Sequence, residues 1–194
     1  MYERWGKRAL DLVGAGLLLL LLAAPLMLAT MLAVRLALGR PVLFTQPRAG
    51  RGGQVFVALK FRSLRDGPGE DAERMTRFGR VLRASALDEL PQLLNVLRGE
   101  MSLVGPRPLL PGYTRRYTPR QAERLRVRPG LAGLAQAAGR NAVPWEQRLE
   151  LDARYVQRIT LGGDLGLLLR CLWLALRGGG ASAPGHATMP EFRG

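Results

Sequence analysis

Apolar residues are concentrated near the start of the chain, where residues 12–34 form 23 consecutive positions without a charged side chain. At about 1.5 Å per residue, a straight helix of this length would cross a bilayer core of about 30 Å. Pro25 interrupts the run, because it lacks a backbone donor and disfavours helical dihedrals at Ala24. Basic residues flank both ends of the run, and short basic flanks favour the cytoplasmic side. If both flanks stay on that side, the segment must enter and leave the bilayer by the same face. The expected structure is therefore a re-entrant helix–break–helix, kinked at Ala24–Pro25, within residues 1–40. A kinked spanning helix is the alternative.

Beyond Gly39 the apolar positions follow shorter patterns that are typical of a small folded domain. Residues 42–44 and 55–61 have the composition of strands, and the turn-rich stretch 47–53 between them predicts a β-hairpin. Residues 66–73 are polar, acidic and contain glycine and proline, which predicts a loop.

Helical spacing dominates the remainder of the chain. Leucines recur on one helical face before Gly99, and Pro91 is tolerated only in a first turn, so a helix is expected to begin near Asp88. Residues 145–159 predict a second helix. Residues 164–177 predict an amphipathic interfacial helix, with a buried core helix as the alternative.

These elements predict a mixed α/β fold that is mostly helical, with a small cytosolic globular domain after the membrane segment. The Arg-Pro-Gly sequence at 128–130 predicts a type II turn, because proline and glycine suit its two central positions. Residues 179–194 are expected to form an irregular tail.

Charge and composition limit the kinds of catalytic and metal site that this chain can form. The 194 residues include 29 Lys plus Arg against 15 Asp plus Glu, which gives a formal net charge of +14. All but two of the basic residues are arginines, and a guanidinium forms two-pronged contacts with phosphate or carboxylate. One cysteine and one histidine exclude an intrachain disulfide and a Cys-cluster metal site, and they disfavour Ser-His-Asp catalysis. An enzyme of this composition would use carboxylates, Arg, Lys, hydroxyls or a hard cation.

The basic charge is compatible with several kinds of partner. Nucleic acid would be bound by phosphate neutralisation. However, the chain has no recognised nucleic-acid motif, and its apolar segment would tether it to a bilayer. Anionic lipid headgroups and a diphosphate substrate fit both halves of the chain better.

The adjacent carboxylates Asp88 and Glu89 are the first candidates for chemistry. Both suit the N-terminus of a helix, so capping is the simpler interpretation. In the functional interpretation, one carboxylate attacks an electrophile while the other orients it, binds a cation or manages a proton. Arg83 precedes the pair by five residues and is placed to bind a phosphate beside it.

Three further segments are candidates for phosphate binding. Two prolines stiffen the chain around Arg107. Lys60 and Arg62 alternate at a predicted strand end and would project to one side. Arg140 and Asn141 lie in a loop that suits a phosphate or base contact. An ordinary turn or a solvated surface is the simpler alternative in each case, and no Walker loop or dinucleotide fingerprint occurs.

These motifs occur in a fixed order along nearly the whole chain. They are Lys7-Arg8 with Asp11, Pro25, Pro41–Phe44 with Gln46, Arg48 and Gly50, Lys60–Ser63, Leu87–Leu93, Asn95–Leu97, Met101–Pro108, Arg128–Gly130, Gly133, Ala135-Gln136 and Gly139–Asn141. In this order the chain strongly resembles the bacterial sugar transferase family, the monotopic polyprenyl-phosphate phosphoglycosyl transferases.

The resemblance implies transfer of a sugar 1-phosphate from a UDP-sugar to undecaprenyl phosphate, with release of UMP, at the cytoplasmic face of the bacterial inner membrane. It implies that Asp88 is the nucleophile, which forms a covalent phosphosugar intermediate, and that Glu89 is its partner. It also implies a Mg²⁺ cofactor, with Asp88 and Glu89 as its expected ligands. The catalytic domain would comprise residues 41–178. The expected substrate- and phosphate-binding residues are Lys60, Arg62, Arg83, Arg107, Arg128, Arg140 and Asn141.

Further motifs suggest a subfamily. Gly139–Ala142, Trp145, Gly185-His186 and Thr188 resemble the diacetylbacillosamine 1-phosphate transferases of bacterial N-glycosylation. UDP-N,N'-diacetylbacillosamine is therefore the expected donor. UDP-galactose, UDP-glucose or a UDP-N-acetylhexosamine for surface polysaccharide is the alternative. A non-catalytic basic membrane adaptor or nucleic-acid tether is the alternative of another class. The expected partners are the UDP-sugar, undecaprenyl phosphate and an anionic membrane, without nucleic acid. The oligomeric state is not predicted, and a homo-oligomer is compatible with the sequence.

Overall fold

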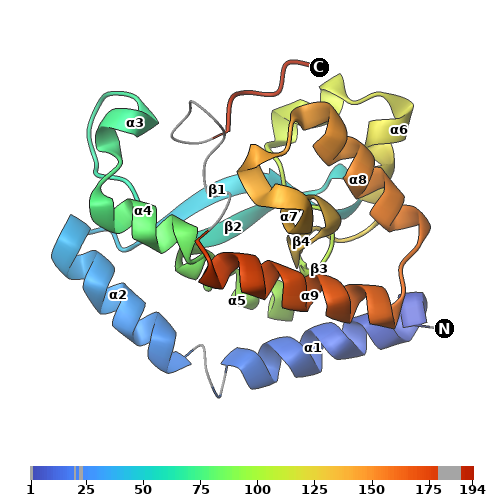
Figure 1. Ribbon diagram of the computed structural model, residues 1–194, viewed down its shortest axis with the longest axis horizontal. Helices are drawn as coiled ribbons and strands as arrows, with labels where there is room; N and C mark the ends of the chain where they lie inside the picture. The colour runs from blue at the N-terminus through green and yellow to red at the C-terminus, as the bar shows by residue number, and fades with distance from the viewer. Residues whose placement is uncertain (1, 20, 22–23, 179–188) are drawn as a thin grey trace.

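The computed structural model describes residues 2–19, 21, 24–178 and 189–194, and confirms a mixed α/β fold that is mostly helical (Figure 1). The predicted hairpin is confirmed: β1 (Leu43–Ala49) pairs antiparallel with β2 (Val55–Phe61). A second pair, β3 (Ser102–Val104) and β4 (Gly130–Ala132), is parallel. The motif residues Gly185, His186 and Thr188 lie outside the described part of the chain.

Helices make up most of the remaining structure. In chain order they are η1 (Tyr2–Gly6), α1 (Lys7–Leu18), α2 (Ala24–Leu38), η3 (Arg51–Gly53), α3 (Asp71–Arg74), α4 (Arg77–Ala84), η4 (Leu87–Glu89), α5 (Gln92–Arg98), η5 (Pro111–Arg116), α6 (Pro119–Ala122), η6 (Glu123–Arg126), α7 (Leu134–Gly139), η7 (Arg140–Ala142), α8 (Trp145–Gln157) and α9 (Leu161–Leu176). The predicted helices at 145–159 and 164–177 are thus confirmed as α8 and α9. The predicted loop at 66–73 ends in the short helix α3.

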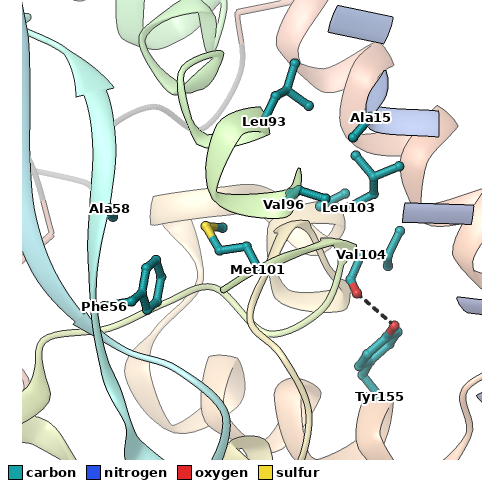
Figure 2. Close-up of a cluster of buried hydrophobic side chains, with 10 residues drawn as sticks. Ala15, Phe56, Ala58, Leu93, Val96, Met101, Leu103, Val104 and Tyr155 are labelled. Carbon is teal, nitrogen blue, oxygen red and sulfur yellow. Dashed lines mark hydrogen bonds between the residues drawn. The ribbon is translucent and has the colours of Figure 1, made fainter. Parts of the chain in front are cut away.

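The main core joins the hairpin, α5 and β3 (Figure 2). Phe56 from β2 packs with Leu93 from α5, Met101 before β3 and Val104 at its end. The Tyr155 hydroxyl of α8 donates a hydrogen bond of 3.1 Å to the Val104 carbonyl. Because α5 follows the carboxylate pair and β3 precedes Arg107, this core fixes both segments of the candidate site.

The N-terminal apolar segment forms two separate helices. Figure 1 shows α1 along the lower edge of the view and α2 rising from its far end. Pro25 lies in the first turn of α2, where a missing donor costs little. Residues 20, 22 and 23, between these two helices in sequence, lie outside the described part. Within the described residues, no helix combines the length and the hydropathy that a bilayer crossing requires. Re-entrant insertion at Ala24–Pro25 stays a prediction.

Two local predictions were wrong. Residues 128–130 do not form a type II turn, since Gly130 lacks a positive φ and begins β4. A Cβ on Gly130 would lie 2.0 Å from the backbone nitrogen of Gly105, so close strand packing requires this glycine. In the second case, the helix expected to begin near Asp88 begins at Gln92, because the short helix η4 precedes it. Gly99 ends that helix in a left-handed conformation (φ 83°), as predicted.

Buried carboxylates join α1 to the rest of the fold. Asp164 of α9 accepts hydrogen bonds from the Tyr2 hydroxyl (2.6 Å), Lys7 Nζ (2.7 Å) and the Tyr155 hydroxyl (2.9 Å). Asp11 of α1 accepts from the Ser102 hydroxyl and the Leu103 amide, both at 2.9 Å. These contacts connect α1 to β3, α8 and α9.

We expect Asp164→Ala to lower the free energy of unfolding by about 3–5 kcal/mol, because it leaves Lys7 buried without its carboxylate partner. Thermal unfolding of the full chain in detergent micelles, followed by circular dichroism, would measure the loss. Glu146→Ala on the exposed surface of α8 is the control and should leave the melting temperature unchanged. Equal melting temperatures for Asp164→Ala and the wild type would contradict this assignment.

Candidate active site

A cleft of about 550 Å³ contains the predicted chemistry. Its volume lies within the range of about 300–1,000 Å³ that is common for small-molecule sites. The cleft is lined by one face of β1, the end of β2, the loop after β2 and the helices α3, α4 and η4. The segment from Arg107 to Tyr113, η7, the start of α8 and residues 189–190 complete the lining. Every predicted catalytic or substrate-binding residue except Arg128 lines it.

A tight turn places the two carboxylates in the cleft. Helix α4 ends at Ala84, and Ala86 then adopts a left-handed conformation (φ 57°, ψ 15°). Such a conformation is uncommon for a residue other than glycine and tends to occur at functional sites. The short helix η4 follows at once, so both Asp88 and Glu89 face the cleft before α5 begins.

Glu89 is bound by two cations. Lys60 Nζ lies 2.7 Å from Glu89 Oε1. Arg107 forms a fork, in which Nη1 donates to Oε2 at 3.2 Å and Nη2 donates to Oε1. Burial alone would raise the pKa of Glu89, but Arg107 and Lys60 hold this pKa well below its ordinary value. Glu89 is therefore a permanent anion near neutral pH, and the geometry suits the orientation of Lys60 and Arg107 better than proton transfer.

Asp88 lies in a different environment. Asp88 is buried, with 6% of its surface exposed. Within the described part of the chain, the Asp88 carboxylate makes no hydrogen bond and no ion pair. Burial raises the pKa of Asp88 to about 6, although nearby Lys60 opposes the rise. A desolvated carboxylate with unengaged oxygens is suited to attack an electrophile that enters the cleft.

The raised pKa of Asp88 leads to a pH prediction. Only the ionised carboxylate can act as a nucleophile, so activity should rise as pH increases through about 6 and approach a plateau above it. We expect kcat/KM to fall about tenfold for each pH unit below that value. Initial rates between pH 4.5 and 8 at constant ionic strength would test this, with circular dichroism as the control for unfolding. A flat profile down to pH 4.5 would contradict the assignment.

Three further predicted residues line the cleft together with the carboxylates. Arg83 Nε donates to the Ser63 hydroxyl at 2.8 Å. Arg140 Nη1 and Nη2 donate to the carbonyls of Ala84 and Arg83, each at 2.9 Å, so η7 is joined to the end of α4. Asn141 Oδ1 accepts from Arg148 Nη2 at 3.3 Å. The structure therefore brings all three side chains into the lining of the cleft.

Two other predicted residues have different surroundings. Arg62 lines the cleft but is buried, and its guanidinium donates to the Leu38 carbonyl and to Asp66. It joins the end of α2 to the loop after β2. Arg128 lies outside the cleft, where its Nε donates to the Gly99 carbonyl at 2.8 Å. Neither geometry supports a direct role in phosphate binding, which stays a prediction for both.

Several cleft residues are not among those expected to bind substrate or act in catalysis. Arg48, whose Nη1 donates to the Pro108 carbonyl at 3.2 Å, supplies a further cation beside Arg107. The sequence feature that could have indicated Arg48 is its place in the ordered series of motifs. An aromatic end of the cleft is formed by Tyr113 and Trp145, which come from segments distant in sequence. Trp145 occurs in one of the motifs quoted above, whereas Tyr113 had no such signal.

The carboxylates allow a partial test of the expected Mg²⁺ site. This ion prefers oxygen ligands and commonly binds one or two carboxylates together with ligand phosphates. Asp88 fits that pattern, whereas both oxygens of Glu89 already accept hydrogen bonds from cations. Within residues 2–19, 21, 24–178 and 189–194, no group of three or more His, Cys, Asp or Glu forms a protein-only metal site. Asp88 together with phosphate oxygens is the arrangement that fits.

The chain is similar to known proteins along most of its length. A family model described as bacterial sugar transferase matches residues 2–178. The chain is 44% identical over 194 residues to the uncharacterized sugar transferase EpsL of Bacillus subtilis (strain 168), covering 97% of this chain and 96% of that protein.

Two other relatives have names that include a substrate. The UDP-glucose:undecaprenyl-phosphate glucose-1-phosphate transferase of Caulobacter vibrioides is 46% identical over 182 residues, which are 84% of this chain and 67% of that protein. The undecaprenyl-phosphate galactose phosphotransferase of Salmonella typhimurium is 37% identical over 202 residues, which cover 92% of this chain and 42% of that protein. These two names refer to glucose and galactose, not to diacetylbacillosamine.

Proposed function

This chain belongs to the bacterial sugar transferase family, and on that premise we propose that it transfers glucose 1-phosphate or galactose 1-phosphate from the UDP-sugar to undecaprenyl phosphate, releasing UMP. It is a phosphoglycosyl transferase, so the non-catalytic adaptor is excluded. The names of the relatives support a glucose or galactose donor in place of the diacetylbacillosamine donor expected from the sequence motifs. The proposed product then serves the synthesis of a surface polysaccharide and not N-glycosylation.

The observation that carries the proposed mechanism is the contrast between the two adjacent carboxylates. Asp88 has oxygens free to attack, while Glu89 is neutralised by Lys60 and Arg107. In the first step, an Asp88 oxygen attacks the phosphorus that carries the sugar, the bond from that phosphorus to the UMP oxygen breaks, and UMP leaves. In the second step, a phosphate oxygen of undecaprenyl phosphate attacks the same phosphorus and the aspartyl oxygen is released as a carboxylate.

The surrounding cations suit both steps. Carboxylate attack on a diphosphate brings negative charges together, and preorganised Arg and Lys groups stabilise that charge in a desolvated site. Arg107 and Lys60 are oriented by Glu89, and Arg83 is oriented by Ser63. When bound, Mg²⁺ would supply further charge neutralisation, with Asp88 and the phosphate oxygens as its ligands.

A lipid acceptor requires attachment to a membrane. Exposed apolar side chains on α1, α2 and α9, including Leu17, Leu32, Leu169 and Trp173, support placement of these helices in the cytoplasmic leaflet of the bacterial inner membrane. We therefore keep residues 1–40 as the proposed re-entrant segment and residues 41–178 as the catalytic domain. The site would then lie near the headgroup plane, where the lipid phosphate is found.

A panel of donors tests the reaction and its sugar together. UMP release would be measured with undecaprenyl phosphate, Mg²⁺ and one of UDP-glucose, UDP-galactose, UDP-N-acetylglucosamine or UDP-N,N'-diacetylbacillosamine. Fastest turnover is expected with UDP-glucose or UDP-galactose, and EDTA should stop it. A preference for diacetylbacillosamine would overturn the donor, and no UMP release from any donor would overturn the reaction.

A further inference from the structure

The end of the chain forms part of the cleft wall. Met189 and Pro190 line the cleft, and Phe192, which is 4% exposed, anchors this segment. The Phe192 ring lies 5.7 Å from the Tyr113 ring, 5.9 Å from that of Tyr117 and 5.4 Å from that of Trp145, measured between centroids. The segment Met189–Phe192 is therefore held by an aromatic cluster that itself borders the site.

Polar contacts fix the same segment. Trp145 Nε1 donates to the Pro190 carbonyl at 3.0 Å. Arg116 donates to the Phe192 carbonyl and forms an ion pair of 2.7 Å with Glu191. These contacts hold the backbone of the segment in one position against η5 and α8.

Arg148 connects this wall to the phosphate-binding side of the cleft. Its guanidinium lies 5.1 Å from the Trp145 ring centroid and 3.8 Å from Met189 Sδ. It also donates to the Arg140 carbonyl at 2.6 Å. A buried cation thus lies where the aromatic surface meets the arginine-rich surface.

The two ends of the cleft differ in chemistry. Tyr113, Trp145 and Met189 make one end aromatic and apolar. At the other end Asp66 and Asp71 are each ion-paired to an arginine, Arg62 and Arg74 respectively, so that end is polar and charged. A UDP-sugar has its nucleoside and its sugar on opposite sides of the diphosphate. An extended donor with its sugar-bearing phosphate at Asp88 would place these two parts toward opposite ends.

We infer that the aromatic end, closed by the segment Met189–Phe192, is the binding site for the nucleoside of the donor. A flat pyrimidine ring suits aromatic and thioether surfaces, since stacking on an aromatic side chain is available to every base. The polar end would receive the sugar, whose hydroxyl groups can donate to the carboxylates and accept from the guanidinium groups there. This inference rests on the proposed function and adds a positioning role for the end of the chain.

Phe192→Ala in the full-length protein tests this role. The substitution removes the anchor without touching the carboxylate pair or its cations. We expect the KM for the UDP-sugar and the inhibition constant of UMP to rise together by about 5- to 150-fold. The KM for undecaprenyl phosphate should not change, and Phe192→Leu should recover part of the loss. Arg193→Ala, at an exposed neighbouring position, is the matched control.

The measurements separate this inference from the function on which it rests. Unchanged UMP inhibition in Phe192→Ala would overturn the nucleoside site, whether or not the preference between UDP-glucose and UDP-galactose shifts. A rise confined to the KM for undecaprenyl phosphate would also overturn it. UMP binding by calorimetry needs no turnover. If the wild type binds UMP through Phe192 yet releases none from any UDP-sugar, only the proposed reaction fails.

Discussion

Asp88→Asn is expected to reduce UMP release from every UDP-sugar by about 10⁴-fold or more, a loss typical of removing a catalytic nucleophile. An amide cannot form the aspartyl phosphate bond. The fold should survive, because within the described chain the Asp88 carboxylate makes no hydrogen bond on which packing depends. Initial rates of UMP release with saturating donor and acceptor would measure the loss.

Intact mass spectrometry provides a direct second readout. Wild-type protein incubated with the UDP-sugar but without lipid acceptor should gain the mass of one sugar phosphate, and Asp88→Asn should gain none. Glu146→Gln, an exposed carboxylate on α8, is the control for the loss of one charge. Full turnover or a persistent adduct in Asp88→Asn would refute the nucleophile assignment.

Arg107→Ala is expected to have the second largest effect. It removes a cation from the diphosphate site and also leaves Glu89 with Lys60 as its one remaining ion-pair partner among the described residues. Loss of one group that stabilises developing charge lowers kcat by about 10²–10³-fold. Rates of UMP release at saturating donor would measure the change.

Arg107→Lys separates charge from geometry. Lysine keeps the charge but cannot form the two-pronged contact with both Glu89 oxygens, so recovery should be partial. Arg126→Ala, which changes an exposed arginine outside the cleft, should retain wild-type rates. If Arg107→Ala retained the wild-type kcat, Arg107 would have no role in the chemistry.

Much of the local structure follows from sequence patterns. The hairpin, α8, α9 and the stop at Gly99 could be predicted because each depends on spacing within a short window. The position of Asp88 could not be predicted in detail. A left-handed Ala86 and the short helix η4 separate α4 from α5, and no local propensity favours alanine in that conformation.

The sequence indicated which residues belong to the site, but not the separate roles of the two carboxylates. Asp88 and Glu89 are adjacent and chemically alike. Their difference comes from Lys60 and Arg107, which reach Glu89 from positions 29 and 18 residues away. Arg128 lies outside the cleft, where it donates to a backbone carbonyl, so its expected role in phosphate binding stays a prediction.

The aromatic end of the cleft depends wholly on tertiary structure. Tyr113, Trp145 and Phe192 belong to three segments that no spacing rule connects. The parallel pair of β3 and β4 was missed for a similar reason, since three-residue strands leave almost no pattern. Long-range contacts of this kind become visible only once the chain has folded.

The cation-lined cleft has a kinetic consequence. Donor and lipid phosphate must occupy the same cations in succession, so the first product has to leave before the second substrate can enter. A two-substrate experiment should then give parallel double-reciprocal lines, the signature of a ping-pong mechanism. Excess undecaprenyl phosphate should inhibit competitively against the UDP-sugar, because it would occupy the unloaded enzyme.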